Sequence, residues 1–170
     1  MVATREPGGT ELGEALRDVL LARAPGELAA LAEVQLFAAA RAQLVHEVIL
    51  PALHSGRWVV ADRYVDSSLA YQGSGRELGA DVVWAVNEPV VSGCMPDLTV
   101  VVDVPVATAG ERRCAAPDRI EAEGAGFQRR VADGYRRLAE EHPDRVRSVD
   151  GDAPVERVHA EVMALVEALS

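Results

Sequence analysis

The chain has 170 residues, of which 49% are hydrophobic and 26% are charged, so it can bury one core but is too short for two ordinary domains. Its formal net charge of −10 excludes the extended basic surface that nucleic-acid binding requires. All 17 basic residues are arginines, so these residues offer no lysine for a Schiff base or a phosphate-binding loop.

The N-terminal part is predicted to be a strand, a loop and a helix. Residues 1–4 form the expected strand, and residues 5–10 are rich in turn-forming glycine and proline. Thr10 is a suitable N-cap, and apolar residues recur at helical spacing after it, which predicts a helix that ends near Ala22.

A long apolar helix is predicted next, over residues 27–53. This stretch is rich in Ala, Leu and Val and has no internal glycine. We expect a bend near Arg41 and a kink in the last turn at Pro51, because proline cannot donate a backbone hydrogen bond.

Two apolar runs, residues 57–62 and 98–103, each end in an aspartate and are typical of strands in a covered parallel sheet. The other predicted elements are helices from about Asp66, over residues 81–91, from Asp103 through Arg113, over 123–141 and over 155–169, and a strand over 145–149. This alternation predicts a single α/β domain over residues 1–170, with a doubly wound parallel sheet and helices on both faces.

The cysteines, the histidines and the apolar runs indicate a soluble protein of the cytoplasm. Cys94 and Cys114 stand alone, which gives no disulfide framework or zinc site, and the four histidines have no paired-ligand spacing. No apolar run approaches the roughly 18 to 20 residues of a membrane span, and no signal peptide follows Met1.

Ligands of open parallel sheets bind beyond the carboxyl ends of the strands. The most informative segment there is 62–73, because Asp62 at a strand end suits Mg²⁺ or a phosphoryl acceptor, and Arg63 can grip a phosphate. The alternative is a surface ion pair between Asp62 and Arg63, with Asp66 capping a helix.

Five motifs in order and register resemble those of the bacterial thymidylate kinases: TREPGGT at 4–10, FAAARAQ at 37–43, DRYVDSSLAYQG at 62–73, PDLT at 96–99 and DRIE at 118–121. The resemblance covers essentially the whole chain. It implies the fold of the P-loop nucleoside monophosphate kinases and transfer of the ATP γ-phosphate to dTMP, giving dTDP, with Mg²⁺. It also implies a homodimer, for which the helix over 27–53 is a candidate contact.

The resemblance implies a set of dTMP-binding residues. Arg5 and Arg63 match the pair that grips the 5′-phosphate, Phe37 matches the ring that stacks on thymine, and Arg41 matches the residue that hydrogen-bonds a base carbonyl. Further matches, to contacts around the base and the deoxyribose, are Ser68, Tyr71 and Gln72. The residues alone leave alternatives: Phe37 as core, Ser68 as a helix cap and Arg5 as a solvated loop residue.

The resemblance also implies a donor side. A lid at about 110–122 carries Arg112, Arg113 and Arg119, which match the arginines that neutralise the transferring phosphoryl group beside Asp62. The loop with Asp150 and Pro154 matches the one that contacts adenine. The alternative for the lid arginines is a solvated helix face. The Glu6–Pro7 peptide can be cis or trans.

One part of the family pattern is not found in these residues. The family has a strand, a loop of the form G-x-x-x-x-G-K-[ST] and a helix before the TREPGGT motif. Without them we expect a chain that lacks its first strand and P-loop and has impaired activity. Two alternatives stay open: a non-catalytic relative that binds thymidine nucleotides, and a kinase for dUMP or another monophosphate.

Overall fold

The computed structural model describes residues 1–22, 28–112 and 117–169. In chain order the elements are β1 (Val2–Arg5), α1 (Glu11–Leu21), α2 (Ala30–Leu44), η1 (Val45–Ile49), α3 (Leu50–His54), β2 (Val59–Asp62), α4 (Val65–Ser68), η2 (Leu69–Gly75), α5 (Ala80–Val91), β3 (Thr99–Asp103), α6 (Val106–Glu111), α7 (Ala125–Glu141), β4 (Val146–Asp150) and α8 (Val155–Glu167). The segments η1 and η2 are π-helical. Most predicted elements are confirmed to within a few residues of their ends.

The strands pair in parallel, as predicted, but they do not form one continuous sheet. β1 pairs with β2 from Val2 opposite Val59, and β3 pairs with β4 from Thr99 opposite Val146. Among the described strands none pairs with both β2 and β3, so the hydrogen bonding stops between the two pairs. The described strands thus form two parallel pairs, and the predicted α/β class with parallel strands is confirmed.

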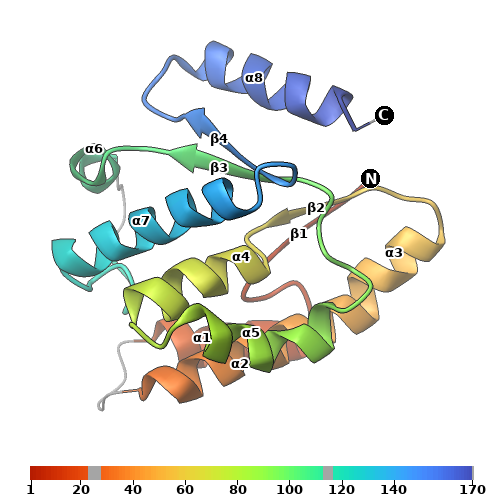
Figure 1. The fold of residues 1–170 in the computed structure, drawn as a ribbon. Helices are drawn as coiled ribbons and strands as arrows, with labels where there is room; N and C mark the ends of the chain where they lie inside the picture. Colours follow the sequence, from red (N-terminus) through yellow and green to blue (C-terminus); the bar gives the residue numbers. More distant parts are fainter. Residues whose placement is uncertain (23–27, 113–116, 170) are drawn as a thin grey trace.

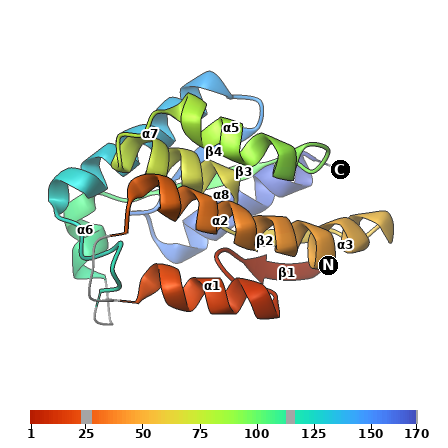
Figure 2. The same cartoon turned by 90° about the horizontal axis from the view of Figure 1, so that it is seen from below.

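Helices cover the two strand pairs in layers. α7 and α8 lie on opposite sides of the β3–β4 pair (Figure 1). Seen from below, α2 lies between α1 and α5, and it packs against both (Figure 2). The two pairs are also tied together by side chains, because the buried Asp66 of α4 accepts hydrogen bonds from Arg145 at 2.6 and 2.8 Å and from Thr99 at 2.7 Å.

The predicted long helix is α2, η1 and α3, which run without interruption over Ala30–His54. Its irregularity lies in the π-helical turn Val45–Ile49, not at Arg41. Pro51 gives the reason, since the proline ring clashes with the carbonyl four residues earlier and a wider turn relieves that clash.

By length and composition the helix Ala30–His54 could cross a membrane, which amends the sequence-based finding that no run is long enough. It carries Glu33 and Arg41, which are buried and bound to side chains of other elements. The helix is therefore built into the core of this domain.

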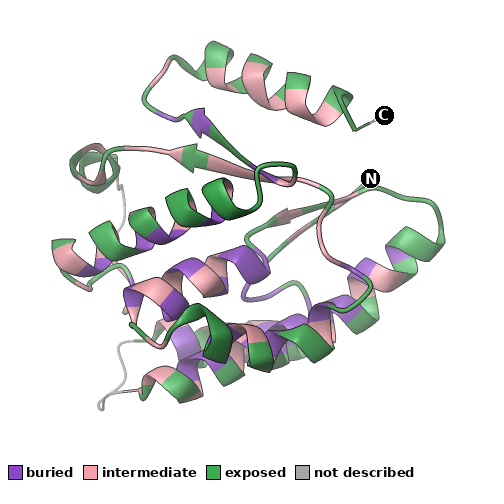
Figure 3. Cartoon of the chain, viewed as in Figure 1, coloured by how far each residue is buried: buried purple, intermediate pink, exposed green. Residues whose placement is uncertain are grey.

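Two clusters stand out among the buried hydrophobic residues that the structure describes. One gathers around Leu44 and Val65, and the other around Phe127 and Val131. The buried residues line the inner sides of α2, α4, η2 and α7 (Figure 3). α7 approaches η2 closely because Gly134 has no side chain: a Cβ there would lie 2.7 Å from the Ser74 Oγ atom.

Two backbone features shape the loops near the strand ends. The Glu6–Pro7 peptide after β1 is cis, which settles the alternative left open by the sequence. Arg63, directly after β2, has a φ of 69° in the left-handed region, which a non-glycine residue rarely adopts. Such outliers gather at functional sites.

Candidate functional site

A cavity of about 440 Å³ lies between the loop after β1, α1, α2, the segment after β2, and residues 118–121. Several residues predicted from the sequence line it together, namely Phe37, Arg41, Arg63, Tyr71, Gln72 and Arg112. They come from α2, from the loop after β2, from η2 and from the end of α6. The fold thus brings together, in one cavity, residues that lie up to 75 positions apart in the sequence, from 37 to 112.

The cavity has an aromatic wall with a guanidinium beside it. Arg63 lies over the Tyr71 ring, with 4.8 Å between its Cζ atom and the ring centroid. Tyr71 meets Phe127 and Tyr135 edge to face. Burial alone lowers the pKa of Arg63, but the neighbouring Tyr71 and Tyr135 raise it above its usual value. Arg63 therefore offers a permanent positive charge next to a ring face.

Phe37 takes part in both the cavity and the core. It is half-buried, lines the cavity and packs against the cluster that contains Phe127. Phe37 therefore belongs to the core and also borders the cavity, so the two interpretations left open by the sequence do not exclude each other.

Arg41 is 1% exposed and is held by a buried network. Its Nε and Nη2 atoms donate to the Glu6 carboxylate, with Nη2 at 2.6 Å from Oε2, and Nη1 donates to Asn87. Nη2 also donates to the Ser68 hydroxyl at 3.1 Å. All three nitrogens of Arg41 thus have protein partners, and Ser68 lies behind the arginine, outside the residues that line the cavity.

Arg5 is not among the residues that line the cavity. It is exposed, and its Nη2 atom lies 3.0 Å from both carboxylate oxygens of Glu14. The arginine that lines the cavity near the loop is Arg17 of α1, whose Nη1 atom donates to the Pro7 carbonyl at 2.8 Å. Sequence reasoning missed Arg17. Its signal was available, because Arg17 is a basic residue on the helix that directly follows the glycine-rich loop at 5–10.

Tyr135 of α7 was also missed. Its hydroxyl is 2.8 Å from the Ser67 hydroxyl, and desolvation raises the pKa of Tyr135 to about 12. The apolar spacing of Val131 and Tyr135 on α7 indicated only a core face. Contact with the cavity wall through Tyr71 depends on how α7 packs against η2, which the pattern does not reveal.

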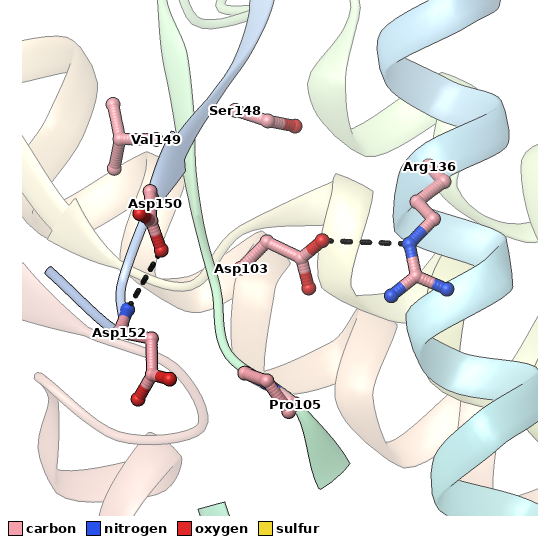
Figure 4. Close-up of a pocket in the computed structure, with 7 residues that line it drawn as sticks. All are labelled: Asp103, Pro105, Arg136, Ser148, Val149, Asp150 and Asp152. Atoms are coloured by element: carbon pink, nitrogen blue, oxygen red, sulfur yellow. Dashed lines mark hydrogen bonds and ion pairs between the residues drawn. The ribbon is translucent and has the colours of Figure 1, made fainter. Parts of the chain in front are cut away.

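A second, open cavity of about 600 Å³ lies at the carboxyl ends of β3 and β4 (Figure 4). Asp103 and Arg136 point toward each other, with 3.4 Å between Oδ2 and Nε, and the Asp150 carboxylate accepts from the Asp152 amide at 3.0 Å. Pro154 is outside the lining of this cavity and precedes α8.

Arg112 links the two cavities. It lines the first, and its Nη1 and Nη2 atoms donate to the Gly151 carbonyl at 2.7 Å and to Asp152 at 2.9 Å in the loop beside the second. The structure thus places this predicted lid arginine against the predicted donor loop.

Arg119, another arginine of the predicted lid, is bound away from the cavity. Arg119 donates to the Leu20 carbonyl at 2.8 Å and pairs with Glu33 at 2.7 Å, so its guanidinium is not among the groups that line the cavity. Arg113 lies outside the described residues.

Asp62 ends β2 and is exposed. In the described part of the chain no three His, Cys, Asp or Glu side chains come together as a metal cluster. A single carboxylate still fits Mg²⁺, which takes most of its other oxygens from water and substrate phosphates.

Comparisons with known proteins agree with the motifs. The thymidylate kinase family model matches residues 1–162. The chain is 47% identical to the thymidylate kinase of Alkalilimnicola ehrlichii and 45% identical to that of Thiobacillus denitrificans, over 99% and 100% of this chain and 78% and 83% of those proteins. The crystal structure of the thymidylate kinase from Ehrlichia chaffeensis superposes with a TM-score of 0.76 at 32% identity, covering 97% of this chain and 79% of that one. The chain therefore belongs to the thymidylate kinase family, a family of dTMP kinase enzymes.

Proposed function

We propose that the cavity bounded by Phe37, Arg63 and Tyr71 is the acceptor site of a dTMP kinase, which transfers the ATP γ-phosphate to dTMP. The observation that carries the proposal is the combination in one cavity of a half-buried ring, a guanidinium beside a tyrosine face, and buried amide and guanidinium groups. A base can stack on Phe37, Arg63 can hold a phosphate, and the Tyr71 ring can pack against a deoxyribose.

Two of the predicted roles on the acceptor side change in detail. Arg17, which lines the cavity, is a better placed phosphate contact than Arg5, which is paired with Glu14. Arg41 and Ser68 act mainly as the support of the cavity floor, because their polar atoms are bonded to each other and to Glu6. If Arg41 also contacts the base, it does so through the side of its guanidinium group that lines the cavity.

The donor phosphates are proposed to lie between the two cavities. Arg112 is positioned there by Gly151 and Asp152, and Asp150 borders the same edge. A guanidinium held in place before the reaction stabilises charge on a transferring phosphoryl group. Asp62 would hold Mg²⁺, which when bound offsets the negative charge of the phosphates.

The 170 residues as they stand are proposed to transfer phosphate slowly, because they contain neither a lysine nor a G-x-x-x-x-G-K-[ST] loop. The same observation favours a second candidate function, binding of thymidine nucleotides without catalysis. We further propose a cytoplasmic homodimer in which the exposed side of helix 30–54 forms the contact.

Titration calorimetry with dTMP, dUMP and dCMP tests the acceptor site. Tightest binding of dTMP is expected, because dTMP is the proposed acceptor, and tighter binding of dUMP would contradict the proposal. An assay of ADP formation from ATP, Mg²⁺ and dTMP then separates the two candidate functions, because only a kinase releases ADP in proportion to dTMP consumed.

A further inference from the structure

The Glu33 carboxylate joins two separate parts of the chain beneath the cavity. Glu33 is 0% exposed. Gln72 donates to its Oε1 atom at 2.8 Å, and Arg76 forks onto both oxygens, at 3.2 Å from Nε and 3.1 Å from Nη2. Arg119 Nη2 lies 2.7 Å from Oε2. One buried carboxylate therefore gathers η2 and the segment 118–123.

Both of these parts are walls of the cavity. Gln72 lines it from η2, and Asp118, Ile120 and Glu121 line it from the segment 118–123. Glu33 itself does not line the cavity. Any influence of Glu33 on a ligand must therefore pass through the residues it holds.

Other contacts also hold the segment 118–123, among them the buried Ile120 side chain in the cluster with Phe127. Arg119 donates from Nε to the Leu20 carbonyl at 2.8 Å and from its backbone to the Leu21 carbonyl at 3.3 Å, and Arg76 also bonds Glu123. Removing the Glu33 charge would leave the Arg76 and Arg119 guanidinium groups partly buried beside an uncharged group. Losing the charge partner of a buried guanidinium group costs much free energy, so we expect the contacts of Glu33 with Arg76 and Arg119 to be kept or lost together.

We propose that Glu33 is a positioning residue that fixes η2 and the segment 118–123 at the separation required by the nucleotide. The role toward a nucleotide rests on the proposed function, whereas the tether itself does not. Because the same carboxylate holds both walls, its loss loosens both together. Glu123 also joins the two walls, through Arg76, so the control is Glu161, whose pair with Arg157 on α8 does not line the cavity.

Hydrogen exchange without nucleotide tests the tether. The amides of Arg76, Leu78, Ala122 and Glu123 are hydrogen-bonded and report on the two walls. In Glu33→Gln we expect their exchange to accelerate by about tenfold or more in both walls, while amides of β4 stay unchanged. Glu161→Gln, the control, is expected to leave these amides unchanged. Acceleration in one wall only, or equal effects of the two variants, would overturn the proposal.

Nucleotide binding supplies the second readout. The dTMP dissociation constant of Glu33→Gln should rise about tenfold, with that of Glu161→Gln within about twofold of the unaltered chain, since only the first variant loosens the two walls. If Glu33→Gln does not fold, Arg119→Met replaces it: faster exchange at Ala122 with weaker dTMP binding supports the tether, and no change in either contradicts it. Failure of the unaltered chain to bind dTMP would count against the proposed function, and the exchange data would still decide the role of Glu33.

Discussion

Arg41 and Glu6 form an ion pair inside the domain, with 2.6 Å between Nη2 and Oε2 and side-chain exposures of 1% and 4%. The pair connects α2 to the cis-proline loop after β1, 35 positions apart. The pair therefore attaches the loop after β1, which borders the cavity, to α2, which forms the cavity floor. A pair so deeply buried stabilises the fold only while both charges are present.

Glu6→Gln should lower the free energy of unfolding by roughly 3–5 kcal/mol, because the buried Arg41 charge loses its partner. Urea denaturation followed by circular dichroism measures the change. Glu161→Gln, which breaks the exposed pair between Arg157 and Glu161, is the control and should leave the unfolding midpoint unchanged. Equal midpoints for the two variants would show that the Arg41–Glu6 pair is not needed for stability.

Glu33 predicts a specific dependence of stability on pH. Burial raises its pKa, but the hydrogen bonds from Arg76, Gln72 and Arg119 together hold the pKa below its ordinary value of 4.5. The unfolded chain therefore binds a proton at Glu33 more readily than the folded chain does. The stabilisation that the Glu33 charge gives the fold is present above pH 4.5, and it is lost as the pH falls through the lower pKa that Glu33 has in the folded chain.

In urea titrations between about pH 3 and pH 7, the free energy of unfolding of the unaltered chain should fall on acidification more steeply than that of Glu33→Gln. The variant is also expected to be less stable at neutral pH, where the charge is present. Parallel pH profiles would contradict the assignment.

We expect substitution by alanine to have different effects on stability at Gly134 and at Gly126 of α7. A Cβ on Gly134 would lie 2.7 Å from Ser74 Oγ and 3.1 Å from the Ala70 Cα atom, whereas one on Gly126 would meet only Arg130 Nη1, at 3.8 Å. Gly134→Ala should destabilise, since overpacking costs about 1–3 kcal/mol and outweighs a helix-propensity gain of about 1 kcal/mol. Gly126→Ala should be neutral or stabilising. Thermal melts of both variants test the difference in sign.

Phe37→Ala should weaken dTMP binding by about 5- to 150-fold, the loss expected when a base gives up roughly 1–3 kcal/mol of aromatic stacking. Calorimetry at a temperature at which the variant is fully folded measures it. Phe127→Leu is the matched control, because Phe127 belongs to the same cluster but does not line the cavity. Equal loss of affinity in the two variants would mean that Phe37 acts only through packing.

ADP formation by the 170-residue chain with ATP, Mg²⁺ and dTMP should be far below the roughly 1–100 s⁻¹ typical of kinases. The physical reason is that no lysine in these residues can neutralise the donor phosphates. Turnover within the kinase range would refute this expectation and would exclude the non-catalytic alternative.

The sequence by itself determined the local elements, because their signals are local. Thr10 caps α1 by accepting from the Gly13 amide at 2.9 Å, as its position predicted. The aspartate-ended apolar runs became β2 and β3, and the motifs in register identified the family. Turn chemistry, helix periodicity and short motifs are properties of neighbouring residues, so they can be read without knowledge of the fold.

The tertiary structure alone decided which groups face the cavity and which support it. Arg5 and Arg17 are both arginines near the same loop, yet only Arg17 lines the cavity, because Glu14 holds Arg5 outside. Likewise Arg119 is turned toward Glu33, a partner 86 positions away. Such outcomes depend on which charges become buried next to one another, and that is settled by the packing of distant elements, which no local pattern contains.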